Sequence, residues 1–413
     1  MPVVRTTVTA PAPAPALLLL LLTSLLRRGG QVEYRLNVFG FLGSEALRSR
    51  DPLGSTGNYG LQDQRLALQW VSENIAAFGG DATQVMIDGC SAGAGSTANH
   101  VVNAASWPFF SKASGNSGMF AMWNAMTMAD GENTYAAVLK NTGCGDVACL
   151  EGKTTHELSQ AANLGLKRDD PRIDRIFWGP VIDGVDTIGH PWELAQRGHH
   201  FRGPLLLGTA RDEGVSFCGT AANMSRSEFE SWGTEVMPGV PLEPLLELYE
   251  GHPATTGTGC IWGGCTTAHH SEFYWASAKL TGDIGFHCGS RFGAQWLSGS
   301  QPVYLWSYEQ VAEHADSVPH CSETGYIYLS ANAHPKNESA SLLEQQMAAY
   351  WRSFAKYGNP NTGKHRGAPE WPVFTNATDT NLVFDSPIRT GKGLRKKQCD
   401  VCARYSVCQG PSW

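Results

Sequence analysis

The sequence lacks both a long basic run and an apolar stretch of membrane-spanning length. Its longest cluster of positive charges is Arg395-Lys396-Lys397, and the 413 residues carry a net charge of −7 at pH 7, so a nucleic-acid partner is not expected. The leucine-rich block between Leu17 and Leu26 is shorter than the roughly 20 apolar residues that a transmembrane helix requires, so membrane anchoring is not expected either. Hydrophobic residues make up 42% of the chain, which is ample for a packed core and excludes a disordered protein.

The N-terminal segment matches no single targeting pattern. The leucine-rich block has the length of a signal-peptide core, but only Arg5 precedes it, and Arg27-Arg28 occupy the place where a small-residue cleavage site is expected. A working signal, a degraded one and sequence foreign to the fold all remain open. We expect residues 1–31 to form an atypical segment and residues 32–413 to form a single domain.

Eleven cysteines are present, but no metal site is expected. Cys399, Cys402 and Cys408 are spaced as in a metal knuckle, yet no closely spaced histidine completes a set of four ligands. The cysteines instead indicate disulfides that form in an oxidising compartment. Three N-glycosylation sequons also favour a secreted glycoprotein; they begin at Asn223, Asn337 and Asn376.

Alternating strand and helix patterns predict a parallel sheet covered by helices. The expected elements, in chain order, are a strand at 32–36, a helix at 61–78, a strand at 85–88 and a helix that opens at 92. Further strands are expected at 204–208 and 303–307, helices within 225–250, and a long amphipathic helix at 341–356. Trp70 and Phe78 are expected on the apolar face of the first helix.

A candidate nucleophile lies between the strand at 85–88 and the helix that follows it. Gly89-Cys90-Ser91-Ala92-Gly93 has the pattern of a strand-to-helix elbow that raises a serine hydroxyl above the sheet. The flanking glycines keep side chains away from the turn, and the amide of Ala92 is the expected oxyanion donor. Because the cysteine count is odd, at least one thiol is free, and Cys90 is the candidate.

The sequence around this elbow closely resembles the type-B carboxylesterases, the group of carboxylesterases, cholinesterases and lipases. The resemblance covers roughly residues 32–402, and Cys90 stands where this family most often carries glutamate. Its motifs are Asn58–Val71, Asn74-Ile75, Phe78–Asp81, the serine elbow, Gly179–Gly184, and Trp351 with Asn359-Pro360-Asn361. The resemblance implies an α/β-hydrolase fold, with a mostly parallel sheet and helices on both faces.

The serine needs a base, and the base needs a carboxylate to orient it. The strand at 204–208 is followed by Asp212-Glu213-Gly214, and the residues alone do not choose between the two carboxylates. The resemblance implies Glu213 as the acid, because the family's acid is the glutamate of its Asp-Glu-Gly motif. Asp212 is then expected to anchor the loop.

Thirteen histidines compete for the role of the base. His314 and His320 both lie within reach of the strand at 303–307. The resemblance favours His320, because Glu323 follows it three residues later as in the family motif. We expect His287 to be a core or loop residue and His269-His270 to be a surface pair.

These residues predict a serine carboxylesterase. His320 would take the proton of Ser91, Glu213 would orient the imidazole, and an acyl-enzyme would form and be hydrolysed. The partner is a small-molecule ester, and neither a metal nor an organic cofactor is required. The acyl and alcohol preferences are left open, since Trp123 and Phe217 fit core packing better than a substrate-lining role.

The N-terminal part departs from the family pattern. The family carries early sheet strands and a His-Gly-Gly loop that donates oxyanion amides, and no such loop precedes Val32. We therefore expect the N-terminal strands to be missing, a sheet edge to be unpaired, and Ala92 to act as the sole oxyanion donor. The alternatives to an active enzyme are a non-catalytic adhesion or binding module on the same fold and an inactive truncated fragment.

Overall fold

The computed structural model describes residues 6–9, 30–163, 178–251, 255–261, 264–312, 315–329 and 337–408. The leucine-rich block and His314 lie outside the described residues. None of the helices within these ranges has both the length and the apolar composition needed to cross a membrane.

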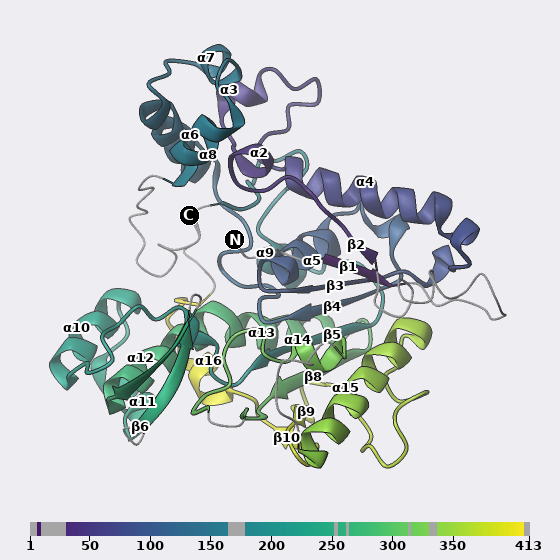
Figure 1. Ribbon diagram of the computed structural model, residues 1–413, viewed down its shortest axis with the longest axis vertical. Helices are drawn as coiled ribbons and strands as arrows, with labels where there is room; N and C mark the ends of the chain where they lie inside the picture. Colours follow the sequence, from purple (N-terminus) through teal and green to yellow (C-terminus); the bar gives the residue numbers. More distant parts are fainter. Residues whose placement is uncertain are drawn as a thin grey trace.

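An eight-stranded mixed sheet forms the centre of the molecule, with strand order β10-β9-β8-β5-β4-β3-β1-β2 (Figure 1). Its five parallel strands are β3 (Met86–Cys90), β4 (Lys112–Asn116), β5 (Leu205–Ala210), β8 (Val303–Tyr308) and β9 (Thr380–Phe384). The antiparallel strands are β10 (Arg389–Lys392), β1 (Thr6–Thr9) and β2 (Gly30–Gln31). The predicted fold class, an α/β-hydrolase sheet of mostly parallel strands, is confirmed.

Both faces of the sheet are apolar and covered by helices. Side chains alternate along β5, so that Leu205 and Leu207 face one layer and Leu206 the other. The first layer contains α5 (Ala92–Val102) and α13 (Cys288–Leu297). The second layer is formed by α15 (Glu338–Tyr357), which buries the predicted apolar residues Met347, Tyr350, Trp351 and Phe354.

Two groups of helices lie beyond the sheet, at the upper left and lower left of Figure 1. The first shares a small apolar core and comprises α2 (Asn37–Phe41), α3 (Glu45–Arg48), α6 (Met128–Thr142), α7 (Val147–Glu151) and α8 (Thr155–Asn163). The second comprises α10 (Arg226–Val236), α11 (Leu242–Tyr249), α12 (Glu272–Gly282) and α16 (Lys396–Arg404). The hairpin of β6 (Thr255–Ile261) and β7 (Gly264–His270) lies on the same side. The short helices α9 (Pro191–Gln196) and α14 (Thr324–Ile327) follow loops near the sheet.

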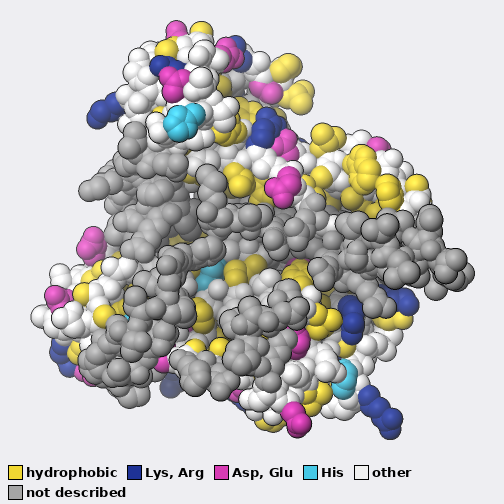
Figure 2. Space-filling view, viewed as in Figure 1, with side chains coloured by type: hydrophobic (Ala, Val, Ile, Leu, Met, Phe, Trp, Pro, Cys, Tyr) yellow, Lys and Arg dark blue, Asp and Glu magenta, His cyan; other side chains and the backbone are white. Residues whose placement is uncertain are grey.

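The first predicted helix forms but buries a different face. α4 (Tyr59–Asn74) continues into the 3₁₀ turn η1 (Ile75–Phe78), and its buried residues are Leu61, Gln64 and Leu68. Trp70 is 51% exposed and Phe78 is 43% exposed, so the prediction that they face the core is wrong. Apolar side chains are accordingly visible over α4 in Figure 2. Residues 61, 64 and 68 follow the helical repeat as well as the apolar set does, but Gln64 is polar, so a search for apolar residues does not reveal this face.

Two expectations about the N-terminal edge of the sheet are also wrong. Residues 32–36 form no strand, because pairing ends at Gln31. The edge of β3 is not unpaired, since Thr6–Thr9 pair with it in antiparallel register from Thr6 opposite Gly89 to Thr9 opposite Met86. Backbone pairing requires only a short extended segment, and four residues are enough to satisfy the hydrogen-bonding groups along this edge.

Four disulfides are formed among the described residues. They join Cys90 to Cys321, Cys144 to Cys149, Cys288 to Cys399, and Cys402 to Cys408. The expectation that Cys90 is the free thiol is therefore wrong; Cys218 is a free cysteine in the described part of the chain. The partner of Cys90 lies 231 positions away, and sequence spacing alone does not reveal such a pair.

We expect two neighbouring leucines of α15 to differ sharply in their contribution to stability. Leu343 is 2% exposed against the sheet and Leu342 is 46% exposed. Leu343→Ala should lower the free energy of unfolding by about 2–5 kcal/mol, because it leaves a cavity in the core. Leu342→Ala, the matched control, should change it by less than about 0.5 kcal/mol. Urea denaturation followed by tryptophan fluorescence measures both, and equal losses would contradict the assigned helix face.

Candidate functional site

The predicted nucleophile Ser91 sits in a tight turn between β3 and α5. Its backbone has φ 60° and ψ −125°, a conformation that residues with a Cβ rarely adopt. The turn is held by a hydrogen bond from the Ser91 amide to the carbonyl of Asn116, at 3.0 Å. Gly89 is required here, because a Cβ at this position would lie 2.2 Å from the carbonyl group of Gly93. A residue with a Cβ is strained in this conformation, and strained residues of this kind cluster at functional sites.

The amide of Ala92 lies at the first position of α5. At this position an amide has no intrahelical acceptor, and the helix dipole places partial positive charge around it. Ala92 is exposed and lines the same cleft as Ser91. The local geometry is therefore suited to binding an oxyanion at the predicted donor.

The predicted acid and base are in contact. Glu213, the first residue of the 3₁₀ turn η4 (Glu213–Ser216), accepts a hydrogen bond at one oxygen from the Ala210 amide, at 2.7 Å. Its other oxygen is paired with His320 Nδ1. Both side chains are almost fully buried, with exposed fractions of 0% for Glu213 and 1% for His320. Gly214 lets this turn approach α12, since a Cβ there would lie 1.8 Å from the carbonyl oxygen of Ala278.

The neighbouring carboxylate Asp212 faces the backbone of the histidine loop instead. It accepts a hydrogen bond from the Val318 amide at 2.8 Å, and the Asp212 amide donates to the Val318 carbonyl at 2.9 Å. Arg211 also donates to this carboxylate, at 2.8 Å. The structure thus separates the two residues that the sequence left open: Glu213 contacts the imidazole and Asp212 anchors its loop.

His320 Nε2 is buried and makes no hydrogen bond, so the imidazole has one nitrogen available. The hydroxyl of Ser91 is not bonded to it in this structure. The two residues are nevertheless neighbours, because the Cys90–Cys321 disulfide joins the residue before the serine to the residue after the histidine, with Cα atoms 6.3 Å apart. In free enzymes such hydrogen bonds are often long and shorten only when a substrate is bound.

A cleft of about 370 Å³ opens onto Ser91 and Ala92. Its wall is largely apolar and includes the aromatic residues Trp123, Phe217 and Phe286. The rings of Phe217 and Phe286 also contact the His320 ring, with centroids 4.8 and 4.6 Å away. Trp123 and Phe217, which fit core packing better from the sequence, therefore line the cleft.

Sequence reasoning missed several of the cleft residues. Phe286 lies in the π-helical turn η5 (Asp283–His287), and Tyr34 and Trp178 also line the cleft. None of the three belongs to a motif that marks a site, so only the folded chain assembles them. Phe286 alone carried a weak signal, its place within an apolar segment beside His287.

The other histidines have structural surroundings. His287 is 5% exposed and its Nδ1 lies 2.7 Å from the hydroxyl of Thr209, in keeping with a core residue. His270 is also 5% exposed and stacks on Tyr274 with ring centroids 4.3 Å apart. The prediction of a surface position is wrong for His270, because the stacked tyrosine covers it. His269 has no described side chain.

In the described part of the chain, two clusters that contain cysteines have ligand atoms close enough to surround a metal ion. One contains Cys288, Cys402 and Cys408, and the other contains Cys90, Cys321 and Glu323. In both clusters the sulfur atoms are bonded as disulfides. A disulfide sulfur is not a thiolate, which is the form that binds a metal. These groups therefore do not fit a resident metal.

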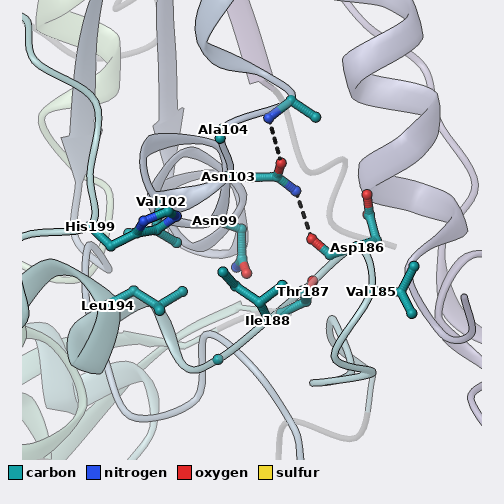
Figure 3. Close-up of a pocket in the computed structure, with 12 residues that line it drawn as sticks. Asn99, Val102, Asn103, Ala104, Val185, Asp186, Thr187, Ile188, Leu194 and His199 are labelled. Atoms are coloured by element: carbon teal, nitrogen blue, oxygen red, sulfur yellow. Dashed lines mark hydrogen bonds between the residues drawn. The ribbon is translucent and has the colours of Figure 1, made fainter.

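A second cleft, of about 230 Å³, contains none of the predicted site residues (Figure 3). Asn103 and Asp186 form one side of it, joined by a 2.8 Å hydrogen bond from the side-chain amide of Asn103 to the backbone carbonyl of Asp186. His199 and Leu194 form the opposite side. With no nucleophile beside a base, it does not have the composition of the Ser91 cleft.

Glu323 is a buried carboxyl close to the predicted triad. Burial raises the pKa of Glu323 to about 8, and the nearby carboxylate of Glu213 adds to the shift. One oxygen lies 3.6 Å from the sulfur of Cys90, and the other is buried without a hydrogen-bond partner. A protonated, neutral side chain at pH 7 fits these surroundings, because a second negative charge would face Glu213 in a poorly solvated place.

This pKa predicts a pH dependence of stability. The unfolded chain loses the Glu323 proton near the ordinary pKa of 4.5, whereas the folded protein keeps it up to about pH 8. Between these values unfolding releases a proton, so this residue lowers the free energy of unfolding as the pH rises, by up to about 1.4 kcal/mol per pH unit. Glu323→Gln should remove this contribution.

The measurement is urea denaturation of wild type and Glu323→Gln at pH 5, 6, 7 and 8. The stability of the variant relative to wild type should increase across this range and level off above pH 8. Glu338→Gln, at the exposed start of α15, controls for the exchange of a carboxyl for an amide. A wild-type-minus-variant difference that is constant with pH would rule out the raised pKa.

Comparison with known proteins places this arrangement in context. A sequence model of the carboxylesterase family matches residues 31–402. Cholinesterase of Mus musculus is 28% identical over 397 residues, which cover 89% of this chain and 62% of that protein. Acetylcholinesterase of Danio rerio is 29% identical and that of Electrophorus electricus 28%, each over 91% of this chain and 66% of the relative. The chain therefore spans slightly less than two thirds of the length of these relatives.

Proposed function

Because the chain belongs to the carboxylesterase family, we propose that it hydrolyses carboxylic esters through Ser91, His320 and Glu213. Family membership makes an esterase-type hydrolase the expected kind of activity. The observation that carries the finer proposal is the buried pairing of Glu213 with His320, whose free nitrogen lies close to the turn that presents Ser91.

The reaction proceeds in two stages. His320 Nε2 accepts the proton of the Ser91 hydroxyl as its oxygen attacks the ester carbonyl. Glu213 stabilises the resulting imidazolium and fixes the tautomer, because its carboxylate holds Nδ1–H. The alcohol leaves with the proton from His320, and water then attacks the acyl-enzyme by the same steps to release the acid.

The carbonyl oxygen gains negative charge in both stages. The amide of Ala92 and the N-terminus of α5 lie at the right place to stabilise it. Donors of this kind typically contribute about 3–4 kcal/mol to the transition state.

The substrate is a small ester with an apolar acyl or alcohol group. The aromatic wall formed by Trp123, Phe217 and Phe286 favours such a group next to the serine. The volume of about 370 Å³ is within the range of pockets for small organic molecules. The names of the relatives describe choline esters as their substrates, and we extend to this chain only the ester class.

We also propose that the protein enters the secretory pathway. Disulfides persist in oxidising compartments, and four are formed in the described residues. The acceptor asparagines of all three sequons are exposed; they are Asn223, Asn337 and Asn376.

A non-catalytic adhesion or binding module is disfavoured by the site itself. Binding by an outer surface does not require a buried carboxylate paired with a histidine beside a strained serine turn. An inactive fragment is disfavoured by the sheet, which is continuous and covered on both faces.

Ser91→Ala should abolish labelling by a fluorophosphonate probe, because no oxygen remains to form the covalent bond. Hydrolysis of p-nitrophenyl acetate should fall at least about 1,000-fold. The matched control is Ser96→Ala. Ser96 lines the same cleft and its hydroxyl accepts a 3.1 Å hydrogen bond from Gln64, so this variant should keep the label. A folded, monodisperse wild type that takes no label would refute the esterase function.

Separate substitution of the two adjacent carboxylates, Glu213 and Asp212, should distinguish their roles. Glu213→Gln should lower kcat about 1,000- to 10,000-fold, because an amide cannot stabilise the imidazolium or hold the tautomer. Asp212→Asn keeps the size of the side chain that anchors Val318 and should lower kcat less than about tenfold. Steady-state hydrolysis of p-nitrophenyl acetate decides between them, and a larger loss in Asp212→Asn would reverse the assignment.

A further inference from the structure

The Cys90–Cys321 disulfide lies in an unusual place for a structural crosslink. Cys90 is the last residue of β3 and directly precedes Ser91, and Cys321 directly follows His320. The crosslink spans 231 positions of sequence and joins the two turns that carry the nucleophile and the base.

We propose that Cys90 and Cys321 are positioning residues for the esterase reaction. Their disulfide holds the histidine loop against the serine turn, so that His320 Nε2 stays within reach of the Ser91 hydroxyl. The inference rests on the proposed function, because it concerns the geometry of the same triad.

The hydrogen bonds of Val318 and the Nδ1 atom of His320 are directed toward the acid and its neighbour Asp212. Val318 is bonded to Asp212 through both its amide and its carbonyl. His320 Nδ1 is paired with Glu213. These bonds fix the imidazole relative to β5 and its loop, whereas the disulfide connects the same loop to the end of β3.

Both turns also contain an unfavourable backbone conformation. Ser91 and Cys321 each have φ 60°, in the left-handed region that residues with a Cβ avoid. Such conformations persist only where the surroundings restrain them, and the disulfide, formed by Cys321 itself and by the residue before Ser91, contributes to that restraint. Loss of the link would allow both turns to relax away from the geometry that the reaction needs.

The Cys90–Cys321 disulfide is uncharged, which is compatible with the buried carboxyl of its neighbour Glu323. Cys90 Sγ lies 3.6 Å from a carboxyl oxygen of Glu323, which is fully buried. A disulfide is neutral and has no titratable proton, so it packs against this carboxyl without adding a second charge. A glutamate at position 90 would place two carboxyls together in the same buried space.

A crosslink that served only stability would behave differently. It would raise the free energy of unfolding by restricting the unfolded chain and leave the rate of the folded enzyme unchanged. A positioning role predicts loss of kcat with little change in KM, because the cleft wall formed by Phe217 and Phe286 does not depend on the sulfur atoms.

The test compares wild type with Cys90→Ser/Cys321→Gly. Glycine at 321 adopts φ 60° without strain, so the variant removes the link and not the backbone conformation. The rate of labelling by a fluorophosphonate probe and the kcat for p-nitrophenyl acetate should fall about 10- to 100-fold, with KM changed less than about twofold. The matched control, Cys144→Ser/Cys149→Ser, removes a disulfide of the α6–α7 region and should react within about twofold of wild type.

Reduction supplies a second measurement on the unmutated protein. A phosphine reductant gives two electrons to the disulfide and becomes its oxide, while one water molecule supplies the oxygen of the oxide and the two protons of the resulting thiols. Reduction of the folded wild type should lower the labelling rate to that of the variant, and reoxidation should restore it. The variant itself should not respond, which separates this disulfide from the others.

The outcomes distinguish the two proposals. Oxidised wild type that never reacts with the probe refutes the esterase function. Reactive wild type, together with a folded variant that reacts equally fast, overturns the positioning role alone. Circular dichroism confirms that the variant folds. If it does not fold, the reduction experiment decides between the outcomes. When peptide mapping shows that Cys90 and Cys321 are thiols in the reduced protein, an unchanged labelling rate overturns the proposal.

Discussion

The parallel register of the central strands is the constraint on which the site depends. Cys90 at the end of β3 lies opposite Asn116 of β4, which in turn lies opposite Gly208 of β5 and through it Trp306 of β8. The three loops that leave β3, β5 and β8 therefore start at one edge of the sheet. Residues 91, 213 and 320 are far apart in sequence, and this alignment is what makes them neighbours.

Burial of Glu213 then sets the orientation of the imidazole. A fully buried carboxylate is costly unless hydrogen bonds compensate for lost water, and its two oxygens are satisfied by the Ala210 amide and His320 Nδ1. Gly214 allows this close packing because any side chain there would collide with α12. Rotation of the His320 ring would break its bond to Glu213 and leave the buried carboxylate without a partner. The energetic cost of this unpaired charge keeps Nε2, the free nitrogen of His320, in one orientation.

The parts of the site that depend on local sequence could be predicted, and those that depend on distant contacts could not. The turn at Ser91 follows from Gly89 and the buried strand before it, so the five residues Gly89–Gly93 are enough to predict its position. Asp212 and Glu213 are adjacent carboxylates on the same turn, and the contacts that distinguish their roles are with Val318 and His320, more than 100 positions away. The choice of Glu213 rested on family resemblance, and so did that of His320.

The predictions that were wrong also depend on contacts that the local sequence does not show. Cys90 was expected to be free because the cysteine count is odd and Cys90 lies beside the nucleophile. Its partner, Cys321, is 231 positions away, and sequence spacing does not reveal such a pair. Trp70 was expected to face the core because apolar residues usually do, but the helix repeat also fits the face that contains Gln64. Gln64 is buried through hydrogen bonds to Ser96 and His100, a network that has no local sequence pattern.

The aromatic wall connects the binding cleft to the proposed chemistry. Phe217 follows the η4 turn that begins at Glu213, and Phe286 comes from η5, yet both rings contact His320 and both line the cleft. They exclude water from the Glu213–His320 pair, and in a poorly solvated environment the attraction between carboxylate and imidazolium is stronger than in water. The same rings favour an apolar group of the substrate, so a bound ester completes the exclusion of water from the imidazole. In the proposed reaction, selectivity for apolar esters and stabilisation of the imidazolium thus depend on one set of side chains.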